Sequence, residues 1–252
     1  TPPKMLYGYS TSFNYKKHWY TRIAGELANH FLRLYDYEIS QRPDILIANS
    51  KNVHNRIKKF YRRESTIIYP GVDVKKYSAV KKTTGEYYLA LNRLVRGKGT
   101  EIIIESCKQL NLPLKVVGDG PEMDKLKQIA GPNTQFLGAV DEEVKIQLLA
   151  NAKALIVATE QEDFGITPVE AMAAGTPVIA ARSGGYLETI IEGKTGEFFK
   201  ASANLGESKS YVDQPSVDNL VKVLSKFNPK KYTATECRNQ AAKFSKQIGR
   251  AH

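Results

Sequence analysis

The chain has 252 residues, more than the roughly 100 to 150 residues of a typical single domain, so we expect one domain and part of a second. Apolar residues make up 42% and charged residues 25%, as in an ordinary globular protein, and no apolar run is long enough to cross a bilayer. The two cysteines, Cys107 and Cys237, lie far apart with no C-x-x-C pair or histidine cluster nearby, which argues against a zinc site and a disulfide framework and favours a reducing cytosol.

The first 70 residues contain two helical patterns and two short strand patterns. Residues 1–15 are rich in Pro, Ser, Tyr and Gly and predict a loop, whereas the apolar spacing over residues 19–39 predicts a helix. Residues 45–48 predict a short buried strand. A second strand is expected at residues 66–69, and the Pro-Gly pair that follows it marks a linker.

The net charge of +11 is concentrated in this first part, because residues 1–70 carry seven of the eleven net positive charges. Between the two strands, Ser50 is the expected cap of a helix whose apolar positions share one face. Its apolar positions are Val53, Ile57, Phe60 and Tyr61, and its basic residues are Lys51, Arg56, Lys58, Lys59, Arg62 and Arg63. One interpretation is a surface for an anionic membrane or a lipid phosphate, to which each near-surface basic residue adds about 1 kcal/mol. The other is a solvated face on a helix that packs normally. We expect no nucleic-acid partner, because no recognised module accompanies the charge.

From residue 87 onward, strand and helix patterns alternate. The expected strands are 87–91, 114–117, 135–137, 154–158, 178–180 and 196–199, and the expected helices between them are 100–110, 122–129, 142–150 and one starting near Thr167. Such alternation predicts an α/β fold with a doubly wound, Rossmann-like parallel sheet, in which ligands gather at the carboxyl ends of the strands. Residues 200–214 predict an irregular segment, and helical patterns follow at 215–227 and 232–248.

The segment from Glu160 to Gly175 is the main candidate for a binding loop. It leads into a helix for which Thr167 is the expected cap and Gly175 the residue just past the end. The amino end of a helix presents unpaired backbone N–H groups and a partial positive charge, so a phosphate is its natural ligand. Two carboxylates, Glu162 and Glu170, bracket the loop with seven residues between them.

Several motifs occur in the order found in one family. They are Tyr-Pro-Gly-Val-Asp at 69–73, Asn-Arg-Leu-Val-Arg-Gly-Lys-Gly at 92–99, Val-Val-Gly-Asp-Gly-Pro at 116–121, Phe-Leu-Gly at 136–138 and Ala-Met-Ala-Ala-Gly-Thr-Pro-Val at 171–178. With Glu162 and Glu170 as its E-x7-E signature, the chain resembles family 4 retaining glycosyltransferases of the GT-B fold from about residue 2 to about residue 245.

The resemblance implies two Rossmann-like domains that face a cleft. Residues 1–68 resemble only the end of the N-terminal, acceptor-binding domain, so we expect this second domain to be truncated. Residues 69–226 resemble the complete nucleotide-sugar-binding domain. Residues 227–252 resemble a helical segment that crosses back toward the N-terminal domain.

The resemblance also implies roles for individual residues. Arg93 and Lys98 resemble the pair that binds the diphosphate, whose growing negative charge is best stabilised by positioned cations; a surface pair beside Arg96 is the alternative. Glu162 resembles the carboxylate that contacts hydroxyl groups of the donor sugar, and an exposed loop acid is the alternative. The loop residues expected around the donor are Asp163, Phe164, Gly165, Ile166 and Thr167.

Two further positions have competing interpretations. Glu170 resembles the residue that accepts hydrogen bonds from the ribose, although Thr167 and Glu170 also have the spacing of a capping box. Gly118 and Gly120 do not complete a dinucleotide fingerprint, because its third glycine would fall at Met123, and we expect them in a turn near the nucleotide.

Two other kinds of site are disfavoured. A glycosidase pair holds its carboxylates about 5 to 9.5 Å apart, whereas the spacing of Glu162 and Glu170 along a continuous helix would be about 12 Å. Asp36 and Glu38 have the spacing of a D-x-D metal motif, but side chains two residues apart on a helix face in different directions. We therefore expect no metal and no cofactor.

The resemblance thus implies transfer of a hexose of the mannose or glucose type from a UDP- or GDP-sugar to a glycan or lipid-linked acceptor, with retention of configuration. The expected location is the cytoplasm or the inner face of the plasma membrane. None of the four histidines matches the catalytic-site histidine that many relatives carry before a Thr-Pro pair. The alternative is a fragment that binds nucleotide sugars without turnover, because most of the acceptor domain is missing.

Overall fold

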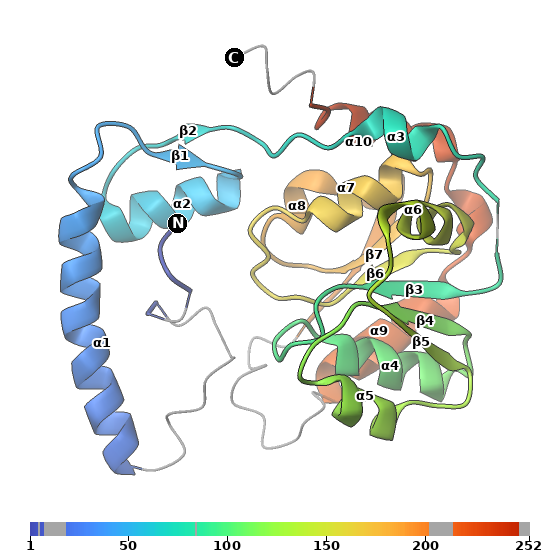
Figure 1. Ribbon diagram of the computed structural model, residues 1–252, viewed down its shortest axis with the longest axis horizontal. Coiled ribbons are helices and arrows are strands. Elements are labelled where there is room, and N and C mark those ends of the chain that lie inside the picture. The colour runs from blue at the N-terminus through green and yellow to red at the C-terminus, as the bar shows by residue number, and fades with distance from the viewer. Residues whose placement is uncertain (5, 8–18, 84, 202–213, 247–252) are drawn as a thin grey trace.

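The computed structural model describes residues 1–4, 6, 7, 19–83, 85–201 and 214–246 (Figure 1). Within these ranges the strands form a parallel six-stranded sheet and a separate parallel pair. The strands are β1 (Ile47–Ala48), β2 (Thr66–Ile67), β3 (Tyr88–Leu91), β4 (Leu114–Val117), β5 (Thr134–Gly138), β6 (Leu155–Val157), β7 (Val178–Ala181) and β8 (Gly196–Phe199). The helices are α1 (Trp19–Ser40), α2 (Lys51–Tyr61), α3 (Val74–Ser78), α4 (Thr100–Gln109), α5 (Met123–Ile129), α6 (Glu142–Asn151), α7 (Ile166–Ala173), α8 (Tyr186–Thr189), α9 (Gln214–Lys226) and α10 (Ala234–Ala242), with a 3-10 turn at Pro229–Lys231.

The large sheet has the strand order β5-β4-β3-β6-β7-β8, and every neighbouring pair is parallel. Numbered by position along the chain, this is the 3-2-1-4-5-6 order of a doubly wound fold, so the predicted architecture is confirmed. The chain winds outward from β3 in one direction and from β6 in the other. The carboxyl ends of β3 and β6 therefore form the topological switch point, where such sheets bind their ligands.

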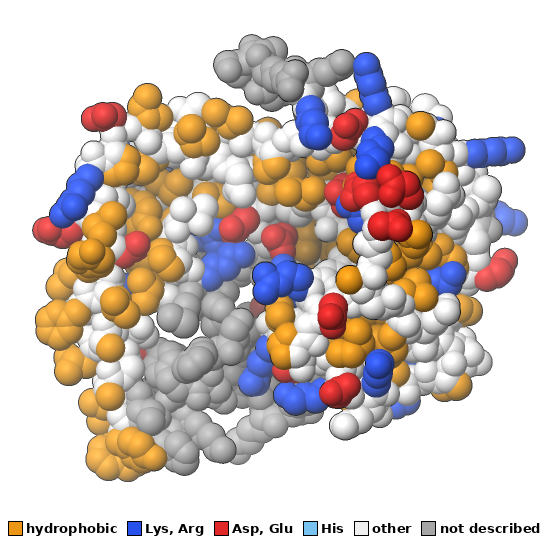
Figure 2. All heavy atoms as spheres, viewed as in Figure 1, with side chains coloured by type: hydrophobic (Ala, Val, Ile, Leu, Met, Phe, Trp, Pro, Cys, Tyr) orange, Lys and Arg blue, Asp and Glu red, His pale blue; other side chains and the backbone are white. Residues whose placement is uncertain are grey.

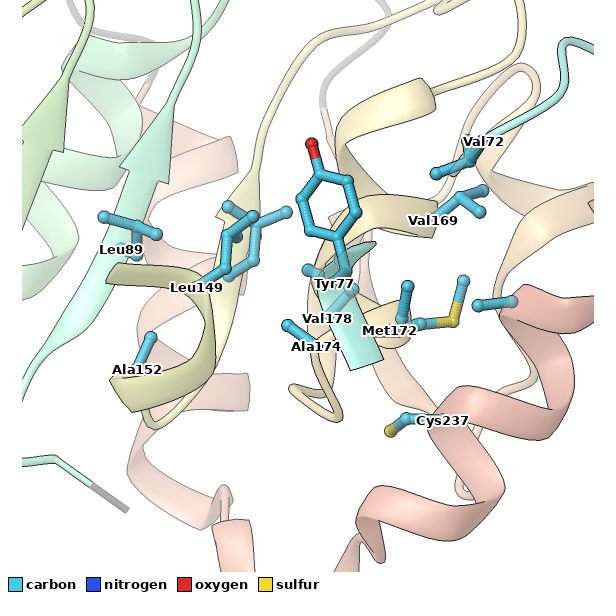
Figure 3. Close-up of a cluster of buried hydrophobic side chains, with 14 of the residues drawn as sticks. Val72, Tyr77, Leu89, Leu149, Ala152, Val169, Met172, Ala174, Val178 and Cys237 are labelled. Carbon is cyan, nitrogen blue, oxygen red and sulfur yellow. The ribbon is translucent and has the colours of Figure 1, made fainter. Parts of the chain in front are cut away.

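Helices cover both faces of this sheet (Figure 1). Because successive residues of a strand point to opposite faces, Leu89 joins the core beneath α6, α7 and α10, whereas Tyr88 and Ala90 join the core against α4, α5 and α9. Figure 3 shows the first core, to which α7 contributes Met172 and α10 contributes Cys237. These two cores fix β3 and β6, and so place the loops that leave their carboxyl ends.

Helix α7 starts two residues earlier than predicted. Gly165, at φ 89°, turns the chain from the loop into the helix in a conformation that glycine adopts readily, so Thr167 lies within the first turn and is not the cap. The prediction of Thr167 as the cap is therefore wrong, and the alternative interpretation of Thr167 and Glu170 as a capping box is excluded with it. At the other end the N–H of Gly175 donates to the carbonyl oxygen of Met172 at 2.9 Å, which confirms Gly175 as the residue just past the helix.

The N-terminal part is less buried than predicted. The first strand is confined to Ile47–Ala48, and the side chain of Ile47 is 61% exposed, so the prediction of a buried strand over residues 45–48 is wrong. Helix α1 exposes apolar side chains, including Phe31 at 62%. Both observations have one reason: β1 and β2 form a sheet of only two strands, against which α2 packs. Ser50 caps α2 as predicted, accepting a hydrogen bond from the N–H of Val53 at 3.0 Å.

One interpretation placed the basic residues in and after α2 on a single solvated face. The structure does not show such a face. Arg56 is buried, because it lies three residues after Val53 on the packed side of the helix. Arg63 donates to the carbonyl oxygens of Ser40 and Pro43 at 2.8 and 2.6 Å, and so ties α1 to α2. Lys51, Lys58 and Lys59 are exposed.

The predicted final helix is too long, because α10 spans Ala234–Ala242 rather than residues 232–248. Beyond it the chain turns at Lys243 and Phe244, and Ser245 forms an isolated parallel bridge with Val72 in the linker after β2, whose N–H donates to the carbonyl oxygen of Phe244 at 2.8 Å. This pairing is incompatible with a continued helix. Residues 247 and 248, and most of the irregular segment predicted at 200–214, lie outside the described residues. None of the described helices combines the length and the apolar character needed to cross a membrane.

Candidate functional site

A cleft of about 350 Å³ opens at the carboxyl ends of β3 and β6. This volume lies within the range of small-molecule sites, and the position is the topological switch point of the sheet, at the strand ends where a ligand is expected. The lining residues are Asn49, Pro70, Leu91, Asn92, Arg93, Lys98, Val157, Thr159, Glu162, Asp163, Phe164, Gly165, Ile166, Thr167, Pro168 and Tyr186. Figure 2 shows basic and acidic side chains close together near the centre of this face, between the N-terminal elements and the large sheet.

Lys98 and Glu162 meet across the switch point. Lys98 lies in the loop after β3 and Glu162 in the loop after β6, and the Lys98 Nζ donates to Glu162 Oε2 at 3.0 Å. Arg93 lines the same cleft, is exposed, and contacts no hydrogen-bond acceptor among the described residues. The cleft therefore brings together the cationic pair and the loop carboxylate predicted from the sequence.

The turn into α7 presents backbone donors to the cleft. Within the described part of the chain, the N–H groups of Phe164, Gly165 and Ile166 have no acceptor, and all three residues line the cleft. The Phe164 ring is buried and packs against Tyr69 and Phe244, with ring centroids 5.6 and 5.3 Å away. The turn is thus anchored by an apolar side chain, and its unpaired amides lie at the amino end of α7, where an anion is favoured.

Asp163 lies between two cations from the N-terminal part. Its carboxylate pairs with Lys4 at 3.0 Å and with Arg56, whose side chain is only 5% exposed. Burial alone would raise the pKa of Asp163, but the charges of Lys4 and Arg56 outweigh it and hold the pKa below its ordinary value. Asp163 therefore fastens the loop after β6 to α2. The sequence carried a partial signal for this, because the spacing from Val53 places Arg56 on the apolar face of α2.

Glu188 fastens the same two parts at a second point. Its carboxylate accepts the backbone N–H groups of Lys51 and Asn52, both at 2.8 Å, and so caps the amino end of α2 from α8. The Asn52 side chain donates in turn to the carbonyl oxygen of Glu162 at 3.2 Å. Nothing in the sequence spacing predicted these contacts, because their partners are more than 100 residues apart.

Glu170 lies beside the cleft and is not among its lining residues. Its carboxylate accepts hydrogen bonds from the Tyr77 hydroxyl at 2.7 Å and from the Lys145 ammonium at 3.1 Å. Burial and the hydrogen bonds to Glu142 and Glu170 raise the pKa of Tyr77. Burial acts to lower the pKa of Lys145, but the same two carboxylates outweigh it and raise that pKa. The structure therefore shows Glu170 held in place by a network, while its ribose contact stays a prediction.

Gly118 and Gly120 also lie outside the cleft lining. A Cβ atom at Gly118 would come within 1.9 Å of the Asn92 carbonyl oxygen, and one at Gly120 within 2.3 Å of the Leu94 carbonyl oxygen. The two glycines thus allow the loop after β4 to pass close to the loop that carries Arg93. The close approach of these two loops is a sufficient reason for glycine at both positions. Their nearness to a nucleotide stays a prediction.

Residues 73–243 match the family model described as glycosyl transferases group 1. The chain is 29% identical over 159 residues to an uncharacterised glycosyltransferase of Methanocaldococcus jannaschii, a match that covers 61% of this chain and 44% of that protein. It is 50% identical over 74 residues to an alpha-1,3/1,6-mannosyltransferase of Dictyostelium discoideum, which covers 29% of this chain and 18% of that protein. The matched regions thus span less than half the length of these relatives.

Among solved structures, the chain is similar to Anabaena HepE in complex with UDP-glucose, with a TM-score of 0.69 and 22% identity. The match covers 87% of this chain and 65% of that one. At this identity the similarity concerns the fold, and it confirms the predicted α/β architecture of the GT-B type. Because the family model matches more than half of its length, the chain belongs to the glycosyl transferases group 1 family.

Proposed function

We propose that the chain is the donor-binding part of a glycosyltransferase that moves a hexose from a nucleotide-diphosphate sugar to a glycan or lipid-linked acceptor with retention of configuration. The observation that carries this proposal is the convergence of Arg93, Lys98, Glu162 and the amides of residues 164–166 on one cleft at the switch point. Cations and amides suit a diphosphate, and a carboxylate suits sugar hydroxyls.

In the proposed reaction, the bond between the anomeric carbon and the diphosphate oxygen breaks, and the diphosphate leaves with the electron pair. The acceptor hydroxyl forms the new bond to that carbon, and its proton passes to the departing diphosphate. Arg93 and Lys98 would stabilise the charge that grows on the leaving group, which is the largest contribution that a fixed site can make. Lys98 already pairs with Glu162 at 3.0 Å, so a donor bound beside this pair would offer its phosphate to the lysine and its sugar hydroxyls to the carboxylate.

The donor is proposed to be a UDP- or GDP-sugar of the mannose or glucose type. The names of the relatives support this range, since one is a mannosyltransferase and one solved structure contains UDP-glucose. Glu170 would accept the ribose hydroxyls, with Tyr77 and Lys145 holding its carboxylate. The two cations supply the charge that a metal would otherwise provide, and we propose a reaction without metal or cofactor.

The proposed organisation follows the predicted boundaries. Residues 1–68 belong to the acceptor side, residues 69–226 bind the nucleotide sugar, and residues 227–252 cross back. The exposed side chains of Lys51, Lys58 and Lys59 would face an anionic membrane if the acceptor is lipid-linked.

A second candidate function is donor binding without turnover. It is favoured by the two-stranded N-terminal sheet and by the exposed apolar side chains of α1, which leave the acceptor side incomplete among the described residues. Calorimetry with UDP and GDP, followed by a transfer assay on this chain and on one extended upstream, separates the two candidates. Turnover by the extended chain alone supports the binding-only interpretation of this fragment. Failure of both nucleotides to bind at millimolar concentration would contradict both candidates.

A further inference from the structure

A second hollow, of about 220 Å³, lies at the opposite edge of the large sheet from the cleft. It is bounded by Lys153, just before β6, and by Pro177, just before β7, so it lies at the amino ends of these strands. The lining residues are Lys82, Lys153, Gly175, Pro177, Pro229, Lys230, Tyr232 and Ala234. Three of them are lysines and none is acidic, which gives the hollow a positive potential that an anion would satisfy.

The three lysines are only partly neutralised by the protein. Lys82 donates to the carbonyl oxygen of Ala152 at 2.6 Å, a neutral acceptor at the end of α6. Lys153 pairs at 3.3 Å with Glu86, whose side chain is 90% exposed, so this pair is weak. Lys230 contacts no acidic side chain in the part of the chain that the structure describes. Burial lowers the pKa of Lys82 to about 8, a cost that a bound anion would remove.

A purely structural role explains one of these lysines. Lys82 satisfies a carbonyl group at the carboxyl end of α6, where a cation is favoured. Lys153 and Lys230 donate to no helix-terminal carbonyl oxygen among the described contacts, so this explanation does not extend to them. Because both ammonium groups lie in the same hollow, an anion from outside the protein would balance their charge.

The rest of the wall suits the organic part of a ligand. The Tyr232 ring stacks on Phe227, with ring centroids 5.2 Å apart, and Pro177 and Pro229 add rigid apolar surface. Ala234 is the first residue of α10, so backbone N–H groups of that helix lie at the same wall. A bare phosphate would leave this apolar surface and most of the 220 Å³ unused.

We propose that this hollow binds a small phosphorylated molecule, with its phosphate on Lys82, Lys153 and Lys230 and its organic part against Tyr232. The site is separate from the donor cleft and does not depend on the proposed reaction. It adjoins Gly175, the residue just past the end of α7, and the amino end of this helix forms the amide turn of the cleft.

The test uses this chain carrying Arg93→Ala, which removes one phosphate contact from the donor cleft. Glucose 6-phosphate and inorganic phosphate are titrated separately while the amide NMR signals of Gly175 and Ala234 are followed. Both probes should shift these signals, and glucose 6-phosphate should bind more tightly. Adding Lys153→Gln and Lys230→Gln together should weaken binding at least about tenfold, because charge-assisted hydrogen bonds are lost.

Lys226→Gln is the matched control, because Lys226 is an exposed lysine at the end of α9 that does not line the hollow. This variant should bind both probes as the parent does. Unshifted signals at millimolar probe, equal affinity for the two probes, or equal losses in Lys226→Gln and in the double variant would each overturn the proposal. Thermal unfolding of the double variant should match that of the parent, since Lys153 and Lys230 reach the surface.

The pH dependence supplies an independent readout. The titratable groups that line the hollow with Lys82 are Lys153, Lys230 and Tyr232. The Cys237 thiol, whose pKa burial raises to about 12, interacts with Lys82, and the Tyr232 hydroxyl donates to Glu197. Since the pKa of Lys82 in the empty site is about 8, affinity should fall as the pH rises through that value and the ammonium loses its proton. An affinity that stays constant across this pH interval would contradict the part assigned to Lys82.

Discussion

Asp163→Asn tests whether one ion pair fastens the loop after β6 to the N-terminal part. The substitution keeps the side chain's size but leaves the Arg56 guanidinium, which is 5% exposed, facing a neutral amide. Breaking a buried pair costs roughly 3 to 5 kcal/mol, whereas a more solvent-accessible pair such as that with Lys4 contributes about 1 kcal/mol. Because the Asp163 side chain is 26% exposed, we expect the lower end, about 3 kcal/mol.

Chemical denaturation at neutral pH measures this loss directly, and thermal unfolding should show a drop of about 6 to 12 °C for a chain of this size. The pKa of Asp163 is lowered in the folded protein, so the stabilisation is present above the ordinary pKa of an aspartate and is lost as the pH falls through the lowered value. The difference between parent and variant should therefore shrink in acid.

Glu64→Gln is the control, because Glu64 pairs with Lys58 at 2.7 Å while its side chain is 70% exposed. This variant should unfold like the parent. If Asp163→Asn were as stable as the parent at neutral pH, or if its deficit grew on acidification, the role assigned to the Asp163–Arg56 pair would be wrong.

Four further substitutions have distinct expected outcomes. Glu188→Ala removes the carboxylate cap of α2 and should destabilise the chain by about 1 kcal/mol in urea denaturation; an unchanged unfolding midpoint would contradict the cap. Gly118→Ala places a Cβ atom within 1.9 Å of the Asn92 carbonyl oxygen and should lower the melting temperature even without ligand, so a normal melting temperature would argue against the backbone explanation. Glu170→Gln should reduce the preference for a nucleoside diphosphate over its 2′-deoxy analogue in calorimetry; Tyr77→Phe should do so less, and an unchanged preference in Glu170→Gln would refute the ribose role.

The strand and helix alternation was sufficient to predict the large sheet. Leu89 and the residues next to it in β3 are all apolar, because helices cover both faces of the sheet. Such a continuous apolar run is recognisable in a sequence. The short helices α3 and α8 were missed, because four or five residues are too few for a 3.6-residue period to emerge. The start of α7 was misplaced because Thr167 has the chemistry of a cap, while the turn itself depends on the positive φ of Gly165.

The sequence predicts those parts of the candidate site that follow from the succession of strands and loops. It does not predict the parts that depend on contacts between residues far apart in the chain. Arg93, Lys98 and Glu162 follow strand ends, so topology alone brings them to one cleft. The sequence pattern grouped Arg56 with the surface charges of its helix, because its partner, Asp163, is 107 positions away in the sequence. The network that holds Glu170 likewise joins three separate helices. Such pairings are set by how elements pack, which residue spacing does not encode.

The most direct test of the donor site is the affinity of Arg93→Ala for UDP and GDP, compared with its affinity for uridine and guanosine, by titration calorimetry. Loss of a charge-assisted contact should weaken binding of the nucleotide favoured by the parent at least about tenfold and leave that of its nucleoside unchanged. Arg96→Ala, an exposed neighbour outside the cleft, should behave as the parent does. Equal losses for diphosphate and nucleoside, or no loss for either, would contradict a cleft built to hold a nucleotide diphosphate.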